Sequence, residues 1–322
     1  MGTPDLAATI LESLLSWDGG RVAAVYCQPD RPAGRGMALK APPVKVLALE
    51  RGLPVHQPLN FKNPDDIAML RDLEPDYLLV AAYGLILPQR VLDIPRRMAL
   101  NVHTSLLPRY RGAAPIQRAI MNGDTETGVT IMGMERGMDT GPVVLQRTVP
   151  IGPDDTAADL HDVLAGIGGT LLINALEGLE AGNLTPRPQN HENATYAAKL
   201  DKSDGAVDFS RSASEIHALV RGVTPWPGAC ATLQREGQPP MTVTILSGRV
   251  ADCDGVLPAE SRPGDILPSL VAGGLAVCSG KGIYCIDCLQ PSGRKRMDAA
   301  AFLNGYLRGH GDARFALPAE AS

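Results

Sequence analysis

Short apolar runs alternate with helical patterns over the first half of the chain. The runs at 21–27 (RVAAVYC), 77–83 (YLLVAAY) and 98–102 (MALNV) are typical of buried strands. Residues 63–73 have a helical pattern, with Asn63 as the N-cap and Pro64 in the first turn. Strands that alternate with helices indicate βαβ units. The pattern therefore predicts an α/β fold with a doubly wound, mostly parallel sheet.

The pattern changes along the second half of the chain. Residues 128–134 and 141–151 predict strands around a turn, and residues 156–182 predict a long helix that is weakened near Gly166 to Gly169. A polar, proline-containing stretch follows, and after it a helix at 212–223 and short β-like runs between Gly and Pro turns predict a small barrel. We therefore expect a first domain at 1–182, a linker at 183–204 and a second domain at 205–322.

Composition narrows the class of protein. The chain has 322 residues, of which 44% are hydrophobic and 20% are charged, and this suits two ordinary globular domains. We see no uninterrupted apolar run of the roughly 18–20 residues that a membrane span needs. We therefore expect no association with a membrane. The six cysteines are scattered and do not form a disulfide framework, so we expect a reducing cytoplasm. A net charge of −5 argues against broad nucleic-acid affinity but allows a local basic patch.

Two polar side chains lie at the end of the predicted strand 98–102. Asn101 and His103 are two positions apart, so on a strand they point to the same side. Sites in open α/β sheets form at the carboxyl ends of the strands. An amide and an imidazole side by side can polarise a carbonyl and move a proton. The same spacing is also compatible with a hydrogen-bonded pair that only closes the strand.

Asp139 lies in the turn ERGMDTGPV. An Asp-Thr-Gly sequence can be no more than an Asx-turn. If the fold brings this carboxylate to His103, it would orient the imidazole ring and favour its charged form. The spacing in the sequence does not decide between these interpretations.

Basic residues concentrate in two segments. The loop 28–45 carries Arg31, Arg35, Lys40 and Lys45 between prolines and glycines, and 292–297 (SGRKRM) carries Arg294, Lys295 and Arg296. Either segment can be a solvated surface loop or can bind phosphate groups.

Motifs for other cofactors are missing. The sequence has neither GxGxxG nor a phosphate-binding loop, and its histidines are dispersed. The cysteines in CIDC (285–288) alternate with strand-like residues and lack the second well-spaced pair of a zinc site. We therefore expect no metal.

Several motifs resemble one family. NVHTSLLPRYRGAAPIQRAI (101–120), followed by GVTIMGMERGMDTGPVV (128–144), resembles the 10-formyltetrahydrofolate-dependent formyltransferases. The segments at 28–48, 80–88 and 223–233 are similar to the members that act on methionyl-tRNA. The resemblance covers nearly the whole chain. The core Asn-x-His-x-Ser-Leu-Leu-Pro and the later Asp indicate the reaction class.

The resemblance implies a function and a set of site residues. The reaction would transfer the formyl group of 10-formyltetrahydrofolate to the amino group of initiator methionyl-tRNA for translation initiation. Asn101, His103 and Asp139 would be catalytic, and the C-terminal domain, OB-like in the family, would help to hold the tRNA together with the basic loop around Arg35. We expect a monomer. The implied folate-binding residues are Ser105, Leu106, Leu107 and Pro108, with Tyr83, Gly84, Leu85, Ile86 and Leu87.

The chain departs from the family pattern at two places. Members carry a full strand before the segment that corresponds to MGTPD, so we expect a strand to precede Met1. Pro142 follows Asp-Thr-Gly where an acidic or small residue is typical, and it should stiffen the loop that carries Asp139.

Two alternatives stay open at this point. The first is a formyltransferase for a small amine, such as glycinamide ribonucleotide or an amino sugar, although the extra domain and the basic loop argue against it. The second is a non-catalytic nucleic-acid-binding protein, although the presence of Asn101, His103 and Asp139 argues against that interpretation.

Overall fold

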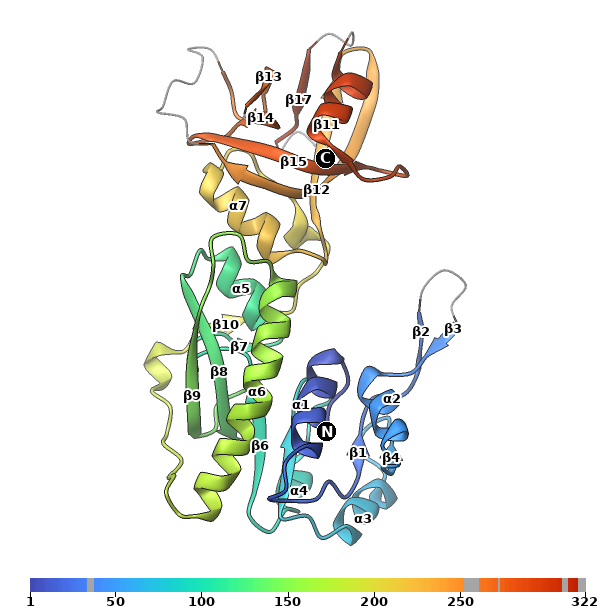
Figure 1. Ribbon diagram of the computed structural model, residues 1–322, viewed down its shortest axis with the longest axis vertical. Coiled ribbons are helices and arrows are strands. Elements are labelled where there is room, and N and C mark those ends of the chain that lie inside the picture. Colours follow the sequence, from blue (N-terminus) through green and yellow to red (C-terminus); the bar gives the residue numbers. More distant parts are fainter. Residues whose placement is uncertain (34–37, 252–260, 272, 309–311, 318–322) are drawn as a thin grey trace. The chain divides into compact units, whose positions relative to one another are not determined.

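The structure is a computed structural model that describes residues 1–33, 38–251, 261–271, 273–308 and 312–317 (Figure 1). The chain divides into two compact units. The first unit comprises Met1–Pro115, Glu126–Pro150 and Asp159–Ala198, and the second comprises Ile116–Thr125, Ile151–Ala158 and Lys199–Ser322.

A two-stranded and a four-stranded sheet organise the first unit. The first consists of β1 (Val25–Tyr26) and β4 (Val55–His56), and the second of β5 (Tyr77–Val80), β6 (Met98–His103), β8 (Glu126–Gly133) and β9 (Val143–Pro150). β1 pairs with β4, and β5 pairs with β6, in parallel. β8 then runs antiparallel to both β6 and β9. The predicted α/β fold is confirmed, and β6 lies between β5 and β8 with its end at His103.

Helices and two short ladders complete the first unit. The helices are α1 (Asp5–Leu15), α2 (Pro43–Glu50), α3 (Pro64–Asp72), α4 (Gln89–Leu92) and α6 (Ala157–Glu180). The ladders are the antiparallel pair β2 (Arg31–Ala33) with β3 (Ala38–Lys40), and the parallel pair β7 (Arg111–Gly112) with β10 (Tyr196–Ala197). The predicted cap of α3 is present, since the Asn63 side chain accepts a hydrogen bond from the Asp65 N–H.

Helix α6 packs closely against its neighbours. The sequence predicts a weak point at Gly166 to Gly169, yet the helix is continuous. A Cβ atom on Gly168 would lie 3.0 Å from Val102 Cγ1 of β6, and one on Gly169 would lie 2.2 Å from Ser13 Oγ of α1. The glycines therefore allow α6 to approach α1 and the sheet, and Figure 1 shows these elements side by side.

Among the described helices, only α6 has the length and the apolar composition that a membrane span requires. Its leucines Leu160, Leu164 and Leu172 are buried in the protein.

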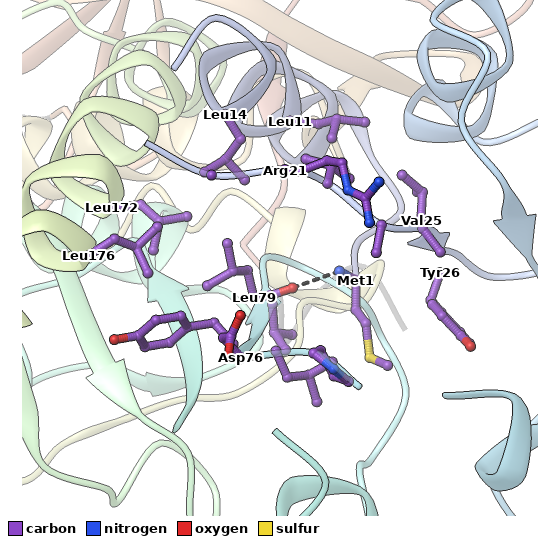
Figure 2. A pocket seen from close by; sticks show the side chains of 18 of the residues that line it. Met1, Leu11, Leu14, Arg21, Val25, Tyr26, Asp76, Leu79, Leu172 and Leu176 are labelled. Carbon is purple, nitrogen blue, oxygen red and sulfur yellow. Dashed lines mark hydrogen bonds between the residues drawn. The ribbon is translucent and has the colours of Figure 1, made fainter. Parts of the chain in front are cut away.

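A cavity of about 660 Å³ lies between β1 and β5 (Figure 2). Gly2 donates to Tyr26 O and forms a parallel bridge to Ala81, so it takes a strand position between the two. The Met1 amino group is buried, which lowers its pKa to about 5, and it donates to Leu79 O. The cavity extends from Met1 along β5, in the place that a longer strand at this position would occupy. The expected strand before Met1 stays a prediction. The predicted strand at 21–27 forms ladder pairs only at Val25–Tyr26.

The second unit is built on an antiparallel β-barrel, as predicted. Its strands are β11 (Ala229–Arg235), β12 (Gln238–Val250), β13 (Ile266–Val271), β14 (Gly274–Cys278), β15 (Ile283–Pro291), β16 (Met297–Asp298) and β17 (Ala313–Phe315). The described order is β13-β14-β15-β12-β11-β17, with β16 on β15, and a bridge between Asp265 and Arg314 brings the two ends together. The helices are α5 (Pro115–Met121), α7 (Ala213–Gly222) and α8 (Ala299–Phe302).

Helix α7 covers part of the barrel core and starts with a capping box. The Ser212 hydroxyl accepts a hydrogen bond from the Glu215 N–H, while the Glu215 carboxylate accepts from the Ser212 N–H at 3.0 Å. The apolar face of α7, with Ile216 and Val220, is buried among residues of β11, β12 and β15. The predicted helix at 212–223 is confirmed, because its cap and its apolar period are both local features.

The capping box predicts a pH dependence of stability. Hydrogen bonds from Ser212, with a smaller effect of Arg211, lower the pKa of Glu215 to about 2 from its ordinary value of 4.5. The folded pKa lies below the unfolded one, so the carboxylate stabilises the fold fully above pH 4.5 and loses this effect as the pH falls towards 2. We expect Glu215→Gln to lower the urea midpoint at neutral pH, and the difference from wild type to shrink below about pH 4.

The control is Glu50→Gln, at an exposed position in α2, which should leave the midpoint unchanged over the same range. A difference between wild type and Glu215→Gln that stays constant from pH 7 to pH 3 would argue against the capping role of the carboxylate.

Candidate active site

The end of β6 carries the amide and the imidazole that the sequence singled out. Asn101 is half-buried, and its backbone pairs with Val80 of β5 and Met132 of β8. Its side-chain amide forms no hydrogen bond with any residue that the structure describes, so its N–H groups are available to a ligand. His103 follows on the same side of the strand and is 6% exposed.

A backbone carbonyl holds the imidazole of His103. Its Nε2 lies 2.9 Å from Tyr110 O. Because a carbonyl oxygen only accepts hydrogen bonds, Nε2 carries the hydrogen in this contact. Nδ1 faces the Asp139 carboxylate, with 3.7 Å between Nδ1 and Oδ2. That distance suits an ion pair but is too long for a hydrogen bond. Nδ1 is therefore the ring atom open to chemistry.

Asp139 reaches the end of β6 from the connection between β8 and β9. Its backbone has φ of 53°, in the left-handed region, which aspartate and asparagine tolerate better than most other non-glycine residues. The carboxylate Oδ2 accepts a hydrogen bond of 2.8 Å from the Gly112 N–H. Oδ1 has no hydrogen-bond partner among the described residues. The fold thus brings the predicted carboxylate to the predicted histidine, with one oxygen held and the other open.

Residues 105–108 form a fixed turn directly after β6. The Ser105 hydroxyl donates to Arg109 O, and the Leu107 N–H donates to Thr130 Oγ1 of β8. Gln146 of β9 donates to Leu107 O, and the Leu107–Pro108 peptide bond is cis. A groove of about 370 Å³ lies beside this turn, lined in part by Leu107, Pro108 and Gln146. The position of the turn thus depends on β8 and β9.

Residues 83–87 follow β5 and present free backbone groups. The Tyr83 carbonyl accepts hydrogen bonds from the side chains of Thr3 and Gln28. The Tyr83 side chain is buried, and this burial raises the pKa of its phenol group. The N–H and C=O groups of residues 84–87 have no hydrogen-bond partner in the described part of the chain. Gly84 has φ of 77°, and Ile86 is 94% exposed. Leu85 is half-buried and Leu87 is buried. Such a segment fits a flat ligand with a polar edge and an apolar face.

The basic residues of the first segment differ in their surroundings. Arg31 and Lys40 are exposed on the β2–β3 ladder, and Arg31 donates to Gln28. Lys45 lies on α2 and forms an ion pair of 2.8 Å with Asp30. The hydrogen bond from Lys45 lowers the pKa of Asp30, so the carboxylate balances the lysine charge. Arg35 lies outside the described residues.

The second basic segment lies in the turn between β15 and β16. Arg294, Lys295 and Arg296 are all exposed, and none of them forms an ion pair with a residue that the structure describes. Their charges are therefore accessible to a polyanion.

The cysteines of the barrel do not form a metal site in the described chain. Cys285 is buried on β15 and Cys278 on β14. No group of three or more His, Cys, Asp or Glu side chains in the searched part of the structure is suited to a metal ion.

The sequence did not single out two buried polar residues next to Asp139. Arg111 is 2% exposed and Gln189 is 7% exposed, and the two are joined by hydrogen bonds. Gln189 belongs to the stretch 183–204, which the sequence predicts as a linker. In the structure the backbone of Arg187 forms hydrogen bonds with Val143 of β9. The same stretch contains β10, which pairs with β7. Only the tertiary structure reveals the partners of its polar side chains.

Both parts of the chain match family models. Residues 1–176 match the model described as "Formyl transferase", and residues 199–307 match "Formyl transferase, C-terminal domain".

Curated proteins and a solved structure are similar to the whole chain. "Methionyl-tRNA formyltransferase" of Nitratidesulfovibrio vulgaris (strain DP4) is 53% identical over 95% of this chain and 92% of that protein. The protein of the same name from Trichlorobacter lovleyi is 44% identical over 95% of this chain and 93% of its own length. The crystal structure of WlaRD, a sugar 3N-formyl transferase, superposes with a TM-score of 0.63 at 17% identity, covering 91% of this chain and 97% of that one. The structural likeness supports the fold.

The turn that carries Asp139 predicts an effect of one methyl group on stability. A Cβ atom on Gly141 would lie 2.0 Å from Gly133 O, which is backbone and cannot move aside alone. We expect Gly141→Ala to destabilise the protein by about 1–3 kcal/mol in urea denaturation, as overpacking does elsewhere. Gly166→Ala is the control, because its Cβ would meet nothing within 4 Å and it lies in α6. It should be neutral or stabilising by up to about 1 kcal/mol. Equal stability of the two variants would show that the turn is not tightly packed.

Proposed function

Because the chain belongs to the formyl transferase family, as its motifs predicted, we propose that it transfers the formyl group of 10-formyltetrahydrofolate to the amino group of initiator methionyl-tRNA. The products are N-formylmethionyl-tRNA, for translation initiation, and tetrahydrofolate, whose N10 loses the formyl group and gains a proton while the amine gives one up. The observation that carries the proposal is the convergence of Asn101, His103 and Asp139 at the end of β6, on a chain that is similar over 95% of its length to proteins of that activity.

The donors at the end of β6 suit a carbonyl oxygen that gains negative charge. The formyl donor supplies the one-carbon group, and the residues that would hold it are 83–87 and 105–108. The Asn101 amide has N–H groups free of hydrogen bonds to described residues and can donate to the formyl oxygen. His103 is fixed through Nε2 by Tyr110 O, so its protonated Nδ1 would be the second donor. Donors placed in advance stabilise such charge without reorganisation.

The carboxylate of Asp139 has two separate tasks in this proposal. Oδ2 lies 3.7 Å from His103 Nδ1 and can compensate positive charge that the ring carries during the reaction. Oδ1 is open and can take the proton that the attacking amine loses, directly or through a water molecule. An α-amino group has an ordinary pKa of about 7.7–8.0. The ester that joins methionine to the tRNA should lower this pKa, so much of the amine is already the free nucleophile near neutral pH.

The accessible basic residues support a tRNA acceptor. Arg31 and Lys40 in the first unit, and Arg294, Lys295 and Arg296 in the second, are exposed and suited to phosphate contacts. Arg35 belongs to the same loop as Arg31 by sequence. Lys45 would instead keep the base of this loop in place through Asp30.

The remaining expectations complete the proposal. Residues 1–182 would form the catalytic domain and residues 205–322 the tRNA-binding domain. The segment 183–204 would connect them and at the same time pack against the site. The protein would act in the cytoplasm as a monomer. The described cysteines are all free, and this suits a reducing compartment.

Kinetics of three variants test the catalytic assignment. We expect Asn101→Ala, His103→Ala and Asp139→Ala each to lower kcat for formylation of methionyl-tRNA by about 10²–10³, with small changes in either KM, because each removes a group that acts on developing charge or on the proton. Asn183→Ala, on an exposed loop, is the matched control. Near-normal turnover in any of the three would remove that residue from its role. A wild-type enzyme that formylates an amino sugar but not methionyl-tRNA would overturn the acceptor.

Salt dependence tests the tRNA contacts. Replacing Arg31, Arg35 and Lys40 by alanine together, or Arg294, Lys295 and Arg296 together, should weaken tRNA binding and flatten the slope of log Kd against log salt by about 0.7–0.9 per lost contact. The KM for the folate donor should stay unchanged. Arg51→Ala, which removes an exposed arginine already paired with Glu12, should leave the slope as it is. An unchanged slope in a triple variant would exclude that segment from the interface.

A further inference from the structure

On the basis of the proposed formyl transfer, we propose that Arg111 and Gln189 are positioning residues that hold Asp139 in the geometry the reaction needs. Neither residue touches the reacting atoms in this proposal. They act through the backbone of the turn that carries Asp139.

Arg111 is a buried cation without a carboxylate partner in the described chain. It lies on β7, is 2% exposed and donates from Nε (3.2 Å) and Nη2 (2.7 Å) to the side-chain oxygen of Gln189. Nη2 also lies 3.1 Å from His191 Nδ1. Burial of a charge is costly, and an apolar pair of the same size would often be at least as stable. Stability alone therefore does not explain an arginine at this position.

Gln189 passes the effect of Arg111 to the turn. Its Oε1 accepts both bonds from Arg111, which fixes the amide so that Nε2 points the other way. Nε2 then donates to Asp139 O at 2.9 Å and to Gly141 O at 2.7 Å. Both N–H groups of this buried amide therefore have an acceptor. Bonds from a cation to the amide oxygen polarise the group and strengthen its N–H donors.

The same short strand holds Asp139 from a second direction. Gly112, the residue after Arg111, donates its N–H to the Asp139 carboxylate. Asp139 is thus held at its carbonyl by Gln189 and at its carboxylate by Gly112. Two such constraints can maintain the positive φ of 53° that turns the carboxylate towards His103. A shift of about 1 Å in a catalytic group can cost about 10²-fold in rate.

The variant Gln189→Glu separates positioning from simple stability. A glutamate has the same shape and gives Arg111 a charged partner, but it removes both N–H donors and places an oxygen against Asp139 O and Gly141 O. We expect kcat for formylation to fall by roughly 10- to 100-fold with both KM values within about threefold of wild type. Backbone hydrogen exchange at Gly112 should become faster, because the carboxylate that accepts its hydrogen bond is displaced.

The matched control is Asn190→Asp, the same chemical change one residue further on. Asn190 is exposed, and its side chain accepts a hydrogen bond from the Glu192 N–H, which an aspartate can also accept. The Asn190→Asp variant should have the kcat of the wild type and the same rate of backbone hydrogen exchange at Gly112. A similar loss in both variants would attribute the effect to added charge and contradict the proposal.

A second variant keeps the test decisive if Gln189→Glu does not fold. The double change Arg111→Met with Gln189→Leu removes the network without leaving an unpaired buried charge. We expect the same loss of kcat and the same faster exchange at Gly112 in a protein that still unfolds cooperatively. Either folded variant with kcat within twofold of wild type and unchanged exchange would overturn the positioning role.

The exchange measurement needs no substrate, so the two proposals fail separately. If the wild-type protein does not formylate methionyl-tRNA, the proposed function fails whatever the variants do. If the wild type is active and Gly112 exchange does not respond to Gln189→Glu, the positioning role fails while the function stands.

Discussion

The contact between the Asp139 carboxylate and the end of β6 is the constraint on which the site depends. Asp139 lies on the β8–β9 connection and His103 on β6, so the 3.7 Å between Oδ2 and Nδ1 exists only if β8 pairs with β6 in the observed register. The bond from the Gly112 N–H to Asp139 Oδ2 and the bond from His103 Nε2 to Tyr110 O hold the two partners separately. The site is therefore a product of strand order rather than of any one loop.

The surrounding structure serves the same geometry. Close packing of α6 through Gly168 and Gly169 covers the sheet behind β6. Thr130 of β8 and Gln146 of β9 hold the turn after β6, so the strands that position Asp139 also position the turn at 105–108. A displacement of β8 would thus disturb the Asp139 carboxylate and the expected folate-binding turn together. The large cavity beside Met1 contains none of these residues, although it is the more spacious of the two described here.

Local features of the sequence predict many of the helices and strands and the change from an α/β domain to a barrel. The capped helices at 63–73 and 212–223, the strand before Asn101 and the change to a barrel all depend on neighbours in sequence. The sequence does not decide whether Asp139 approaches His103, and the structure brings Oδ2 to 3.7 Å from Nδ1. Arg111 and Gln189 were not found, because a buried polar pair is recognised by its partners, and these are separated along the chain. The ion pair of Lys45 with Asp30 could not be found from the sequence for the same reason, and the role of Lys45 in tRNA binding stays a prediction.

The most direct test of the central claim is the kcat of the double variant His103→Ala with Asp139→Ala beside the two single variants. If the two side chains act as one unit at the formyl oxygen, the double variant should be about as slow as the slower single variant, as in other catalytic groups that act together. Losses that multiply, so that the double variant shows the product of the two single effects, would mean that the residues act independently and would contradict the account.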